Sequence, residues 1–273
     1  MFSPTTSRSF WWQLWHTLEL IFTQSVRNVR KNHGNAIIGL MLNIVQTMIL
    51  LGVFLLIFVF AGARGAAIRG DTLIYLMSGV VLFMAHIKTL SAVASAEGPN
   101  SAMMKHRPMN PIVAIGGAAL AELYIQILSI AVILFLYHTI WTPVVIDKPF
   151  GAFAMLLAVW FSGLAIGLVM YAIKPWFPSV AKLLTTLISR MNMVASGKFF
   201  LANTLPASVL PYFTWNPLFH AIDQARGFAF INYNPFNTWL YYPLIFSLCL
   251  IVIGMLGEFY TRNRASLSWA ARQ

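Results

Sequence analysis

Five long apolar stretches dominate this sequence and leave few folds open to it. They cover residues 36–61, 72–95, 112–137, 150–173 and 238–259. A helix that crosses the hydrocarbon core of a bilayer needs about 20 mostly apolar residues, so each stretch is long enough to span a membrane. The chain is 59% hydrophobic and only 9% charged, whereas soluble domains carry about 25% charged residues. The sequence therefore predicts an all-α integral membrane protein.

A sixth apolar stretch, residues 179–197, is a weaker candidate because it carries Lys182 and Arg190. We expect it to span the membrane as well, which gives six transmembrane helices with both termini on one side. The chain then divides into an N-terminal arm, residues 1–35, and a six-helix transmembrane domain, residues 36–273.

The charge of the loops predicts the orientation of these spans. The chain has 18 Lys and Arg residues against 7 Asp and Glu residues, a net charge of +11. With six spans, eleven basic residues fall on the side of the termini and five on the other side. Because basic loops stay in the cytoplasm, we expect both termini to be cytoplasmic. This placement accounts for the basic composition without a nucleic-acid partner.

The N-terminal arm has the pattern of an amphipathic helix. Its apolar residues recur at steps of three and four, which places Trp11, Trp15 and Phe22 on one helical face. Arg27 and Arg30 fall elsewhere on the helical wheel. Such a helix suits the bilayer surface, with aromatic residues toward lipid and basic residues toward water. The alternative is a helix packed on the spans of the same protein.

Residues 198–235 are apolar enough to enter the membrane but are interrupted by Pro206, Pro211 and Pro217. Proline removes a backbone donor and clashes with the preceding turn, so no continuous helix passes through this segment. We expect a re-entrant hairpin of two short helices that dips in from the outer side. Non-helical backbone at membrane depth lines a cavity or is buried in protein, so the hairpin indicates a translocation route. The alternative is an outer loop that rests on the headgroups.

Within this segment, His220 and Asp223 stand one helical turn apart and Arg226 follows three residues later. A His/Asp pair can serve acid–base chemistry. No nucleophile, second carboxylate or metal-ligand set accompanies this pair, so a structural hydrogen bond is the better interpretation. We assign no catalytic residue and no metal ligand to the chain. Trp215 suits either a sugar ring or the aromatic belt of the outer interface.

Charged residues at membrane depth are the candidates for a conduit. Lys88 lies within the second span, Arg190 within the fifth, and Lys198 directly after it. An ionisable side chain in hydrocarbon is costly, so it should face a cavity or a partner, or extend to the interface. We assign these three cations to the wall of a substrate canal, with Glu122 as a candidate counter-ion. The alternative for Lys88 is an ammonium group that extends to the inner interface.

The connection 96–111 between the second and third spans is short and rich in turn-forming and charged residues. Its prolines delimit a helix of about two turns. Such a helix fits a cleft on a cytoplasmic partner, although a plain connector would look similar. The chain has no G-x-x-x-x-G-K-[ST] loop, so it cannot bind ATP phosphates in that way. We therefore expect no cofactor in this chain, and energy for transport would come from an ion gradient or from another subunit.

Several short motifs, in this order along the chain, resemble those of capsular-polysaccharide export permeases (KpsM-like proteins), the membrane subunits of type-two ABC exporters. The clearest are Trp215-Asn216-Pro217-Leu218-Phe219-His220, followed by Asp223 and Arg226, and Glu97-Gly98 through Lys105-His106-Arg107-Pro108 to Pro111, with Glu122 downstream. Two further matches are Lys174-x-x-Phe177-Pro178 and Tyr260-Thr261-Arg262.

The resemblance implies a homodimeric permease of the cell inner membrane that works with two ATPase subunits, which hold the ATP and magnesium. The loop that contains Glu97, Gly98, Lys105, His106, Arg107 and Pro108 would couple to the ATPase. The hairpin residues Trp215, Asn216, Pro217, His220, Asp223 and Arg226 would form an outer gate. The implied cargo is a lipid-linked acidic polysaccharide, received by periplasmic and outer-membrane export proteins. The chain itself would not be an enzyme.

Two other functions stay open at this point. An O-antigen or teichoic-acid permease of the same superfamily would share the architecture but export a different polymer. A polytopic enzyme that acts on lipid-linked sugars would use His220 and Asp223 as its acid–base pair. An ion-coupled carrier is less favoured, because such carriers usually have broken helices in both halves and here only the C-terminal half is interrupted.

Overall fold

The computed structural model describes residues 10–31, 36–60, 68, 71–97 and 110–264. Within these ranges all regular structure is helical, as the sequence predicts. The α-helices are α1 (Phe10–Lys31), α2 (Ala36–Phe60), α3 (Thr72–Ala94), α4 (Pro111–Ile140), α5 (Pro149–Ile173), α6 (Pro178–Ala195), α7 (Pro217–Ala229) and α8 (Tyr242–Arg264). Two single 3-10 turns, η2 (Ala202–Thr204) and η3 (Leu210–Tyr212), lie between α6 and α7.

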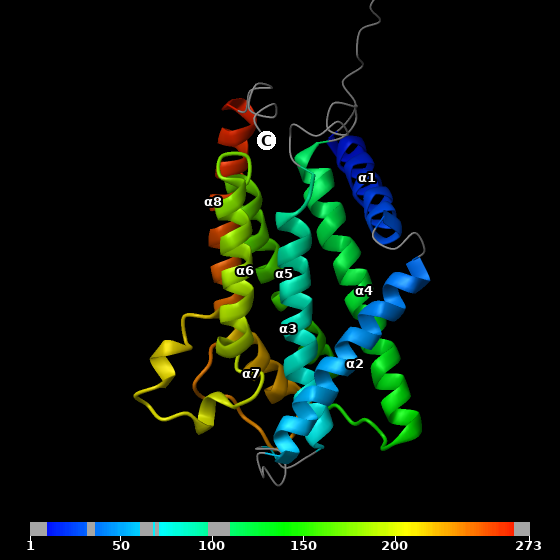
Figure 1. Ribbon diagram of the computed structural model, residues 1–273, viewed down its shortest axis with the longest axis vertical. Coiled ribbons are helices and arrows are strands. Elements are labelled where there is room, and N and C mark those ends of the chain that lie inside the picture. The colour runs from blue at the N-terminus through cyan, green and yellow to red at the C-terminus, as the bar shows by residue number, and fades with distance from the viewer. Residues whose placement is uncertain (1–9, 32–35, 61–67, 69–70, 98–109, 265–273) are drawn as a thin grey trace, which may run out of the picture.

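Five of the described helices, α2, α3, α4, α5 and α8, are long and apolar enough to cross a membrane. These are the five spans that the apolar stretches predict. The sixth stretch forms α6, which has 18 residues and so extends about 27 Å. α6 runs alongside α3 and α5 (Figure 1). Its mixed composition leaves it outside the apolar set, so a sixth span stays a prediction.

Proline marks the start of several helices. Pro111, Pro149, Pro178 and Pro217 each occupy the first turn of α4, α5, α6 and α7. The amide that proline lacks would have no partner at that position, and its fixed φ suits the first helical residue. Asn110 caps α4 by accepting a hydrogen bond from the amide of Val113 at 2.8 Å. The prolines therefore set the boundaries between spans instead of bending them.

α3 and α5 form the centre of the bundle. Gly163 and Gly167, one turn apart on α5, face α3, and a Cβ atom at Gly163 would lie 2.5 Å from the carbonyl oxygen of His86. Small residues spaced by four allow two helices to approach closely. α8 packs along α5, and α2 and α4 pack against α3. The start of α1 and the end of α8 lie at one end of the bundle, and segment 196–241 lies at the other (Figure 1).

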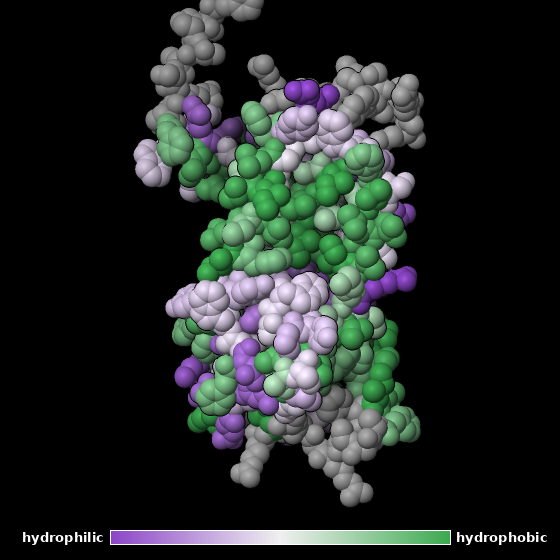
Figure 2. Space-filling view, turned by 90° about the vertical axis from the view of Figure 1, so that its left-hand side faces the viewer, coloured by the Kyte–Doolittle hydropathy of each residue, from purple (hydrophilic) through white to green (hydrophobic). Residues whose placement is uncertain are grey.

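The outer faces of the peripheral helices are apolar. Leu56 of α2, Phe135 of α4 and Leu256 of α8 are 57%, 66% and 65% exposed. Figure 2 shows an apolar band over the side formed by α6 and α8, and a paler zone where segment 196–241 lies. In water such a surface would be strongly unfavourable, whereas lipid is its natural solvent.

α1 packs along α4, and its apolar face points away from the protein. Gln24 and Ser25 are buried against α4, where a Cβ atom at Gly117 would lie 2.6 Å from Gln24. On the opposite face Trp11 and Trp15 are 75% and 72% exposed. The helix is thus present and packed on α4 of the same protein, while the rings of Trp11 and Trp15 are exposed. That this face contacts lipid stays a prediction.

Segment 196–241 differs from the expected pair of short helices. Its first half contains only the two 3-10 turns, because Pro206 and Pro211 interrupt it at short spacing. Its second half contains α7, which packs against α3, α5 and α8. Leu218, Ala221, Ile222 and Ala225 of α7 are buried in the core. That the segment re-enters a membrane stays a prediction.

Candidate functional site

Arg226 is the most connected side chain of the candidate gate. It is fully buried. Its guanidinium donates to the carbonyl oxygens of Gly197 at 2.8 Å, Phe200 at 2.8 Å and Lys198 at 2.6 Å. It also lies 4.2 Å from the ring centroid of Tyr75 on α3. The planar fork of arginine suits several carbonyls at once, so Arg226 fixes the turn that follows α6.

Two glycines make this turn possible. Gly197 has a φ of +72°, a left-handed conformation that ends α6 and that a side chain would disfavour. On α3, Gly79 leaves room for the turn, because a Cβ atom there would lie 2.7 Å from the carbonyl oxygen of Lys198. The turn is therefore held from both sides, by α3 and by α7.

Asp223, one turn before Arg226, holds a different part of the same segment. Its Oδ1 accepts hydrogen bonds from the amide of Ala202 at 3.2 Å and from the Tyr233 hydroxyl at 2.6 Å. Its Oδ2 accepts from the Thr238 hydroxyl at 2.9 Å. The carboxylate is buried with three donors around it. It ties η2 to the stretch that leads into α8.

His220 links two further backbone positions. Its Nε2 donates to the carbonyl oxygen of Thr214 at 2.8 Å, and its Nδ1 accepts from the amide of Trp239 at 2.9 Å. Because Nδ1 accepts a hydrogen bond, the ring is neutral and carries its proton on Nε2. Burial lowers the pKa of His220, against opposing contributions from the bond to Thr214 and the charge of Asp223. Both ring nitrogens are thus occupied by backbone groups, which favours the structural interpretation of the His/Asp pair over catalysis.

Asn216 caps α7 and joins a buried polar network. Its Oδ1 accepts from the amide of Leu218 at 3.0 Å, and its Nδ2 donates to Oδ1 of Asn192 on α6 at 2.8 Å. Asn192 lies 3.5 Å from Nε2 of His86, whose Nδ1 is 2.9 Å from the Ser162 hydroxyl. The network joins α3, α5, α6 and α7.

His86 and Asn192 were not predicted from the sequence as members of a polar site. The signal was present, because strongly polar side chains inside an apolar span need a partner. Within the apolar stretches only Lys, Arg and Glu side chains were selected as candidates, so a histidine and an amide were passed over.

Trp215 lies at the surface, 48% exposed, and its indole donates to the carbonyl oxygen of Tyr212 at 2.7 Å. Tyr212, Trp239 and Tyr241 are also exposed, between 54% and 73%. Amphipathic rings collected at one end of a helical bundle are typical of an aromatic belt at a membrane interface. The arrangement supports the belt interpretation.

Lys198 is buried among aromatic rings. Its ammonium lies 3.5 Å from the ring centroid of Phe83, 4.9 Å from Phe199 and 5.2 Å from Phe54. Within the described part of the chain no atom accepts a hydrogen bond from it. Burial lowers its pKa to about 8. Lys198 therefore does not face an open passage in this conformation, and its assignment to a canal stays a prediction.

Lys88 lies at the junction of α2, α3 and α4. Its ammonium donates to Oδ1 of Asn43 and, at 2.8 Å, to Oε1 of Gln46. Ser129 of α4 accepts a hydrogen bond from Asn43 at 2.6 Å. Lys88 and Glu122 line the same small cavity of about 120 Å³, and their charges interact. The amides of α2 thus satisfy Lys88 at membrane depth.

Apart from the buried Asn192, α6 carries a row of polar side chains along one face. Lys182, Thr186 and Arg190 recur at steps of four and are exposed, and Thr185 and Ser189 lie between them on the same face. The neighbouring face carries exposed apolar residues, among them Val180, Leu183, Leu187, Met191 and Val194. We call the first set the polar stripe of α6. The structure does not bring Arg190 together with Lys88 or Lys198 within one chain.

Only the two ends of the candidate coupling loop, residues 96–97 and 110–111, are described. Glu97 follows α3, and its carbonyl oxygen accepts a hydrogen bond from the Tyr171 hydroxyl at 3.0 Å. Next to it, the Lys174 ammonium donates to the carbonyl oxygen of Ala96 at 3.2 Å. The start of the loop is thus held by the end of α5. The other predicted coupling residues, Gly98, Lys105, His106, Arg107 and Pro108, lie outside the described residues.

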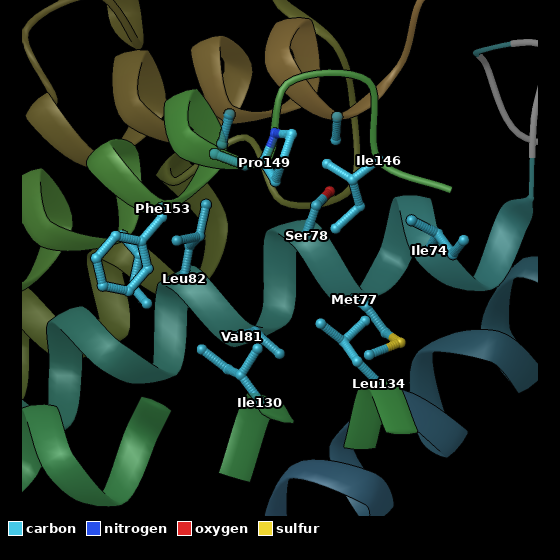
Figure 3. A pocket seen from close by; sticks show the side chains of 14 residues that line it. Ile74, Met77, Ser78, Val81, Leu82, Ile130, Leu134, Ile146, Pro149 and Phe153 are labelled. Carbon is cyan, nitrogen blue, oxygen red and sulfur yellow. The ribbon is translucent and has the colours of Figure 1, made fainter. Parts of the chain in front are cut away.

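Another cavity is apolar. It has a volume of about 240 Å³ between α3, α4, α5 and α7. Figure 3 shows side chains such as Met77, Leu82, Ile130 and Phe153 around it, with Ser78 as a polar group. Nothing in this lining could hold a charged cofactor. Among the described residues no group of three or more His, Cys, Asp or Glu side chains is placed to bind a metal ion.

The fold and its exposed apolar faces define a polytopic helical membrane protein. No protein-family profile matches the sequence. Two proteins of Escherichia coli, both named polysialic acid transport protein KpsM, are 25% identical to the chain over 201 residues, which cover 71% of this chain and 75% of each relative. The capsule polysaccharide export inner-membrane protein CtrC of Neisseria meningitidis serogroup A is 24% identical over 235 residues, which cover 84% of this chain and 86% of CtrC. The chain is therefore similar, over most of its length, to inner-membrane proteins of polysaccharide export.

Proposed function

We propose that this chain is the membrane subunit of an ATP-driven exporter that moves a lipid-linked, acidic capsule polysaccharide across the inner membrane. Two copies form the conduit, and two ATPase subunits bind and hydrolyse ATP. The chain crosses the membrane six times with both termini in the cytoplasm. Periplasmic and outer-membrane proteins receive the polymer.

The observation that carries this proposal is the two-sided surface of α6. Its polar stripe and its apolar face are both exposed. A helix at membrane depth with one face suited to lipid and one suited to water separates the bilayer from a hydrated space. A single copy of the chain leaves that space open on one side, and a second copy would close it. The similarity to polysaccharide export proteins supports the same interpretation.

In this proposal the other regions have distinct tasks. The loop 96–111 enters a cleft of the ATPase, and its start is held by Tyr171 and Lys174. α1 lies at the inner interface, where its exposed tryptophans meet lipid near the point at which a lipid-linked polymer would enter. The segment 196–241 forms the outer gate. The hydrogen bonds of His220, Asp223 and Arg226 keep that gate a defined body that can move as a unit.

The proposal is tested by purifying the tagged full-length chain from its host and measuring ATP turnover and polymer export. We expect an ABC ATPase to copurify and surface polymer to disappear when the gene is deleted. Polymer composition separates the related alternatives, since loss of a neutral polymer would indicate an O-antigen or teichoic-acid type of permease. Turnover of lipid-linked sugars by the chain without any ATPase would contradict the proposal and favour a polytopic enzyme.

A further inference from the structure

A groove between α3 and α6 lies at the end of the bundle where α3 ends and α6 begins. It has a volume of about 490 Å³. Its polar lining consists of two lysines, two serines and two threonines: Lys174, Lys182, Ser91, Ser95, Thr185 and Thr186. The remaining lining residues are small and apolar. We call this the α3–α6 groove. It is distinct from the junction of Lys88 and from the buried Lys198.

The hydroxyl groups of the groove are arranged to accept hydrogen bonds. Thr185 donates to the carbonyl oxygen of Ala181 at 2.8 Å, and Thr186 donates to that of Lys182 at 3.0 Å. Ser95 donates to the carbonyl oxygen of Ala92 at 3.2 Å. A hydroxyl group has one donor and two acceptor positions, so each of these oxygens keeps acceptor capacity for a ligand. A ligand rich in hydroxyl donors would match this surface.

The charge of the groove has one sign. Lys182 is exposed, and among the described residues nothing accepts a hydrogen bond from its ammonium or pairs with it. Lys174 is held by the carbonyl oxygen of Ala96, which is neutral. The described lining contains no carboxylate. Two ammonium groups beside free hydroxyl acceptors complement a ligand that carries both carboxylate or phosphate groups and sugar hydroxyls.

We propose that the α3–α6 groove is a binding subsite for a segment of an acidic glycan, with Lys182 as its principal anionic contact. The inference rests on the proposed exporter function. In addition to that function, the groove is the position at which the polymer is bound before it moves along the polar stripe toward Arg190. The groove lies near the start of the loop 96–111, on the side where the proposal places the ATPase.

Binding to the full-length chain in lipid nanodiscs tests the inference. The probes are oligomers of polysialic acid, which carry one carboxylate per sugar, and neutral dextran oligomers of the same length. We expect the anionic probe to bind more tightly, and Lys182→Ala to weaken its binding about tenfold, the effect of losing one charge-assisted hydrogen bond. Lys182→Arg should restore most of the affinity. Lys148→Ala is the control, since Lys148 is exposed at the opposite end.

The inference is overturned if Lys182→Ala binds the anionic probe as tightly as the wild type, or if dextran binds equally well. A shift of oligomeric state in Lys182→Ala without loss of probe binding would likewise overturn it and assign the groove to contact between copies. Export assays in cells separate the two proposals. If the wild type supports no ATP-dependent export, the proposed function fails. If the wild type exports and Lys182→Ala exports at the same rate, the subsite alone fails.

Discussion

α7 and α6 lie in the same half of the chain, yet they place their charged side chains in opposite ways. On α7, Asp223 and Arg226 are buried, and each is surrounded by hydrogen-bond partners from the neighbouring segment. On α6, Lys182 and Arg190 are exposed along one stripe. Buried polar groups must be satisfied by the fold, whereas exposed ones remain available to a ligand. The comparison teaches that α7 shapes segment 196–241, whereas α6 offers a polar surface.

Loss of Arg226 should have the largest effect on stability. Arg226→Met removes the donors of three buried carbonyl oxygens and should cost about 3–5 kcal/mol. We expect little folded protein in detergent by size-exclusion chromatography, and a strongly lowered Tm in the fraction that folds. Arg226→Lys keeps the charge but not the planar fork, so its Tm should lie between those of the wild type and Arg226→Met. If Arg226→Met had the same Tm as the wild type, the structural role that distinguishes the charged residues of α7 from those of α6 would be contradicted.

Lys198 is the exception within segment 196–241, because it is buried without an acceptor among the described residues. Lys198→Met keeps the shape and removes a desolvated charge, so it should raise stability by about 1–3 kcal/mol. Since its pKa is lowered to about 8, the wild type should gain stability as pH rises from about 8 toward the ordinary lysine pKa of about 10.4. This gain should be absent in Lys198→Met.

Tm measurements on purified Lys198→Met and on the exposed control Lys148→Met would show this effect. A stabilised variant that no longer exports polymer would indicate that the ammonium is kept for function. A destabilised variant would show that the attraction between the ammonium and the surrounding rings outweighs the free-energy cost of burying the charge.

Asp223→Asn should destabilise by about 2 kcal/mol, because the carboxylate accepts three hydrogen bonds and bonds to a charged group are worth about 1.5–3 kcal/mol each. In the variant, the side-chain NH₂ group of Asn would face at least one of these three donors and could not accept a hydrogen bond from it. Tyr233→Phe removes a single bond and should cost less. A double-mutant cycle of the two changes measures their coupling. Additive losses would show that the Tyr233 hydroxyl does not depend on Asp223.

His220 should make segment 196–241 sensitive to acid. Burial lowers its pKa, so the unfolded chain binds a proton more readily than the folded chain below about pH 6.5. The stability that this residue contributes is then present above that pH and is lost as pH falls through the folded pKa. We expect Tm to drop as pH falls below about 6.5, and the drop to shrink in His220→Gln. An unchanged acid response in the variant would assign the effect to other groups.

The smallest effect on stability should come from Arg190. Arg190→Ala on the polar stripe should change the free energy of unfolding by no more than about 0.5 kcal/mol, as expected for an exposed site. Polymer at the cell surface should nevertheless fall several-fold if the stripe lines the conduit. Leu187→Ala, on the apolar face of the same helix, is the matched control. Full export by Arg190→Ala at wild-type levels would remove Arg190 from the conduit.

The sequence predicted the helices well because each depends on local composition. The bounds of α2, α3, α4, α5 and α8 agree with the five apolar stretches to within a few residues. Even the weak stretch around Arg190 is helical, although its hydropathy does not identify it as a span. The segment after α6 was harder, since prolines show where a helix cannot continue but not which fold replaces it.

Three members of the candidate site could be selected from their spacing in the sequence, and their role in a gate stays a prediction. The structure buries His220, Asp223 and Arg226 and gives each of them hydrogen-bond partners within segment 196–241. Their partners could not be predicted, because Arg226 reaches back across 29 residues to Gly197 and across 148 to Ser78. The same limit hid His86 and Asn192, whose partners lie on other helices.

The sequence alone determined that this protein is surrounded by lipid and which helices contact that lipid. Apolar runs of fixed length partition into lipid whatever their neighbours are, so composition alone decides the matter. Only the tertiary structure decided which polar groups are satisfied inside and which remain exposed. That choice depends on helices brought together from distant parts of the chain, since a buried polar group is stable only where a partner from elsewhere meets it.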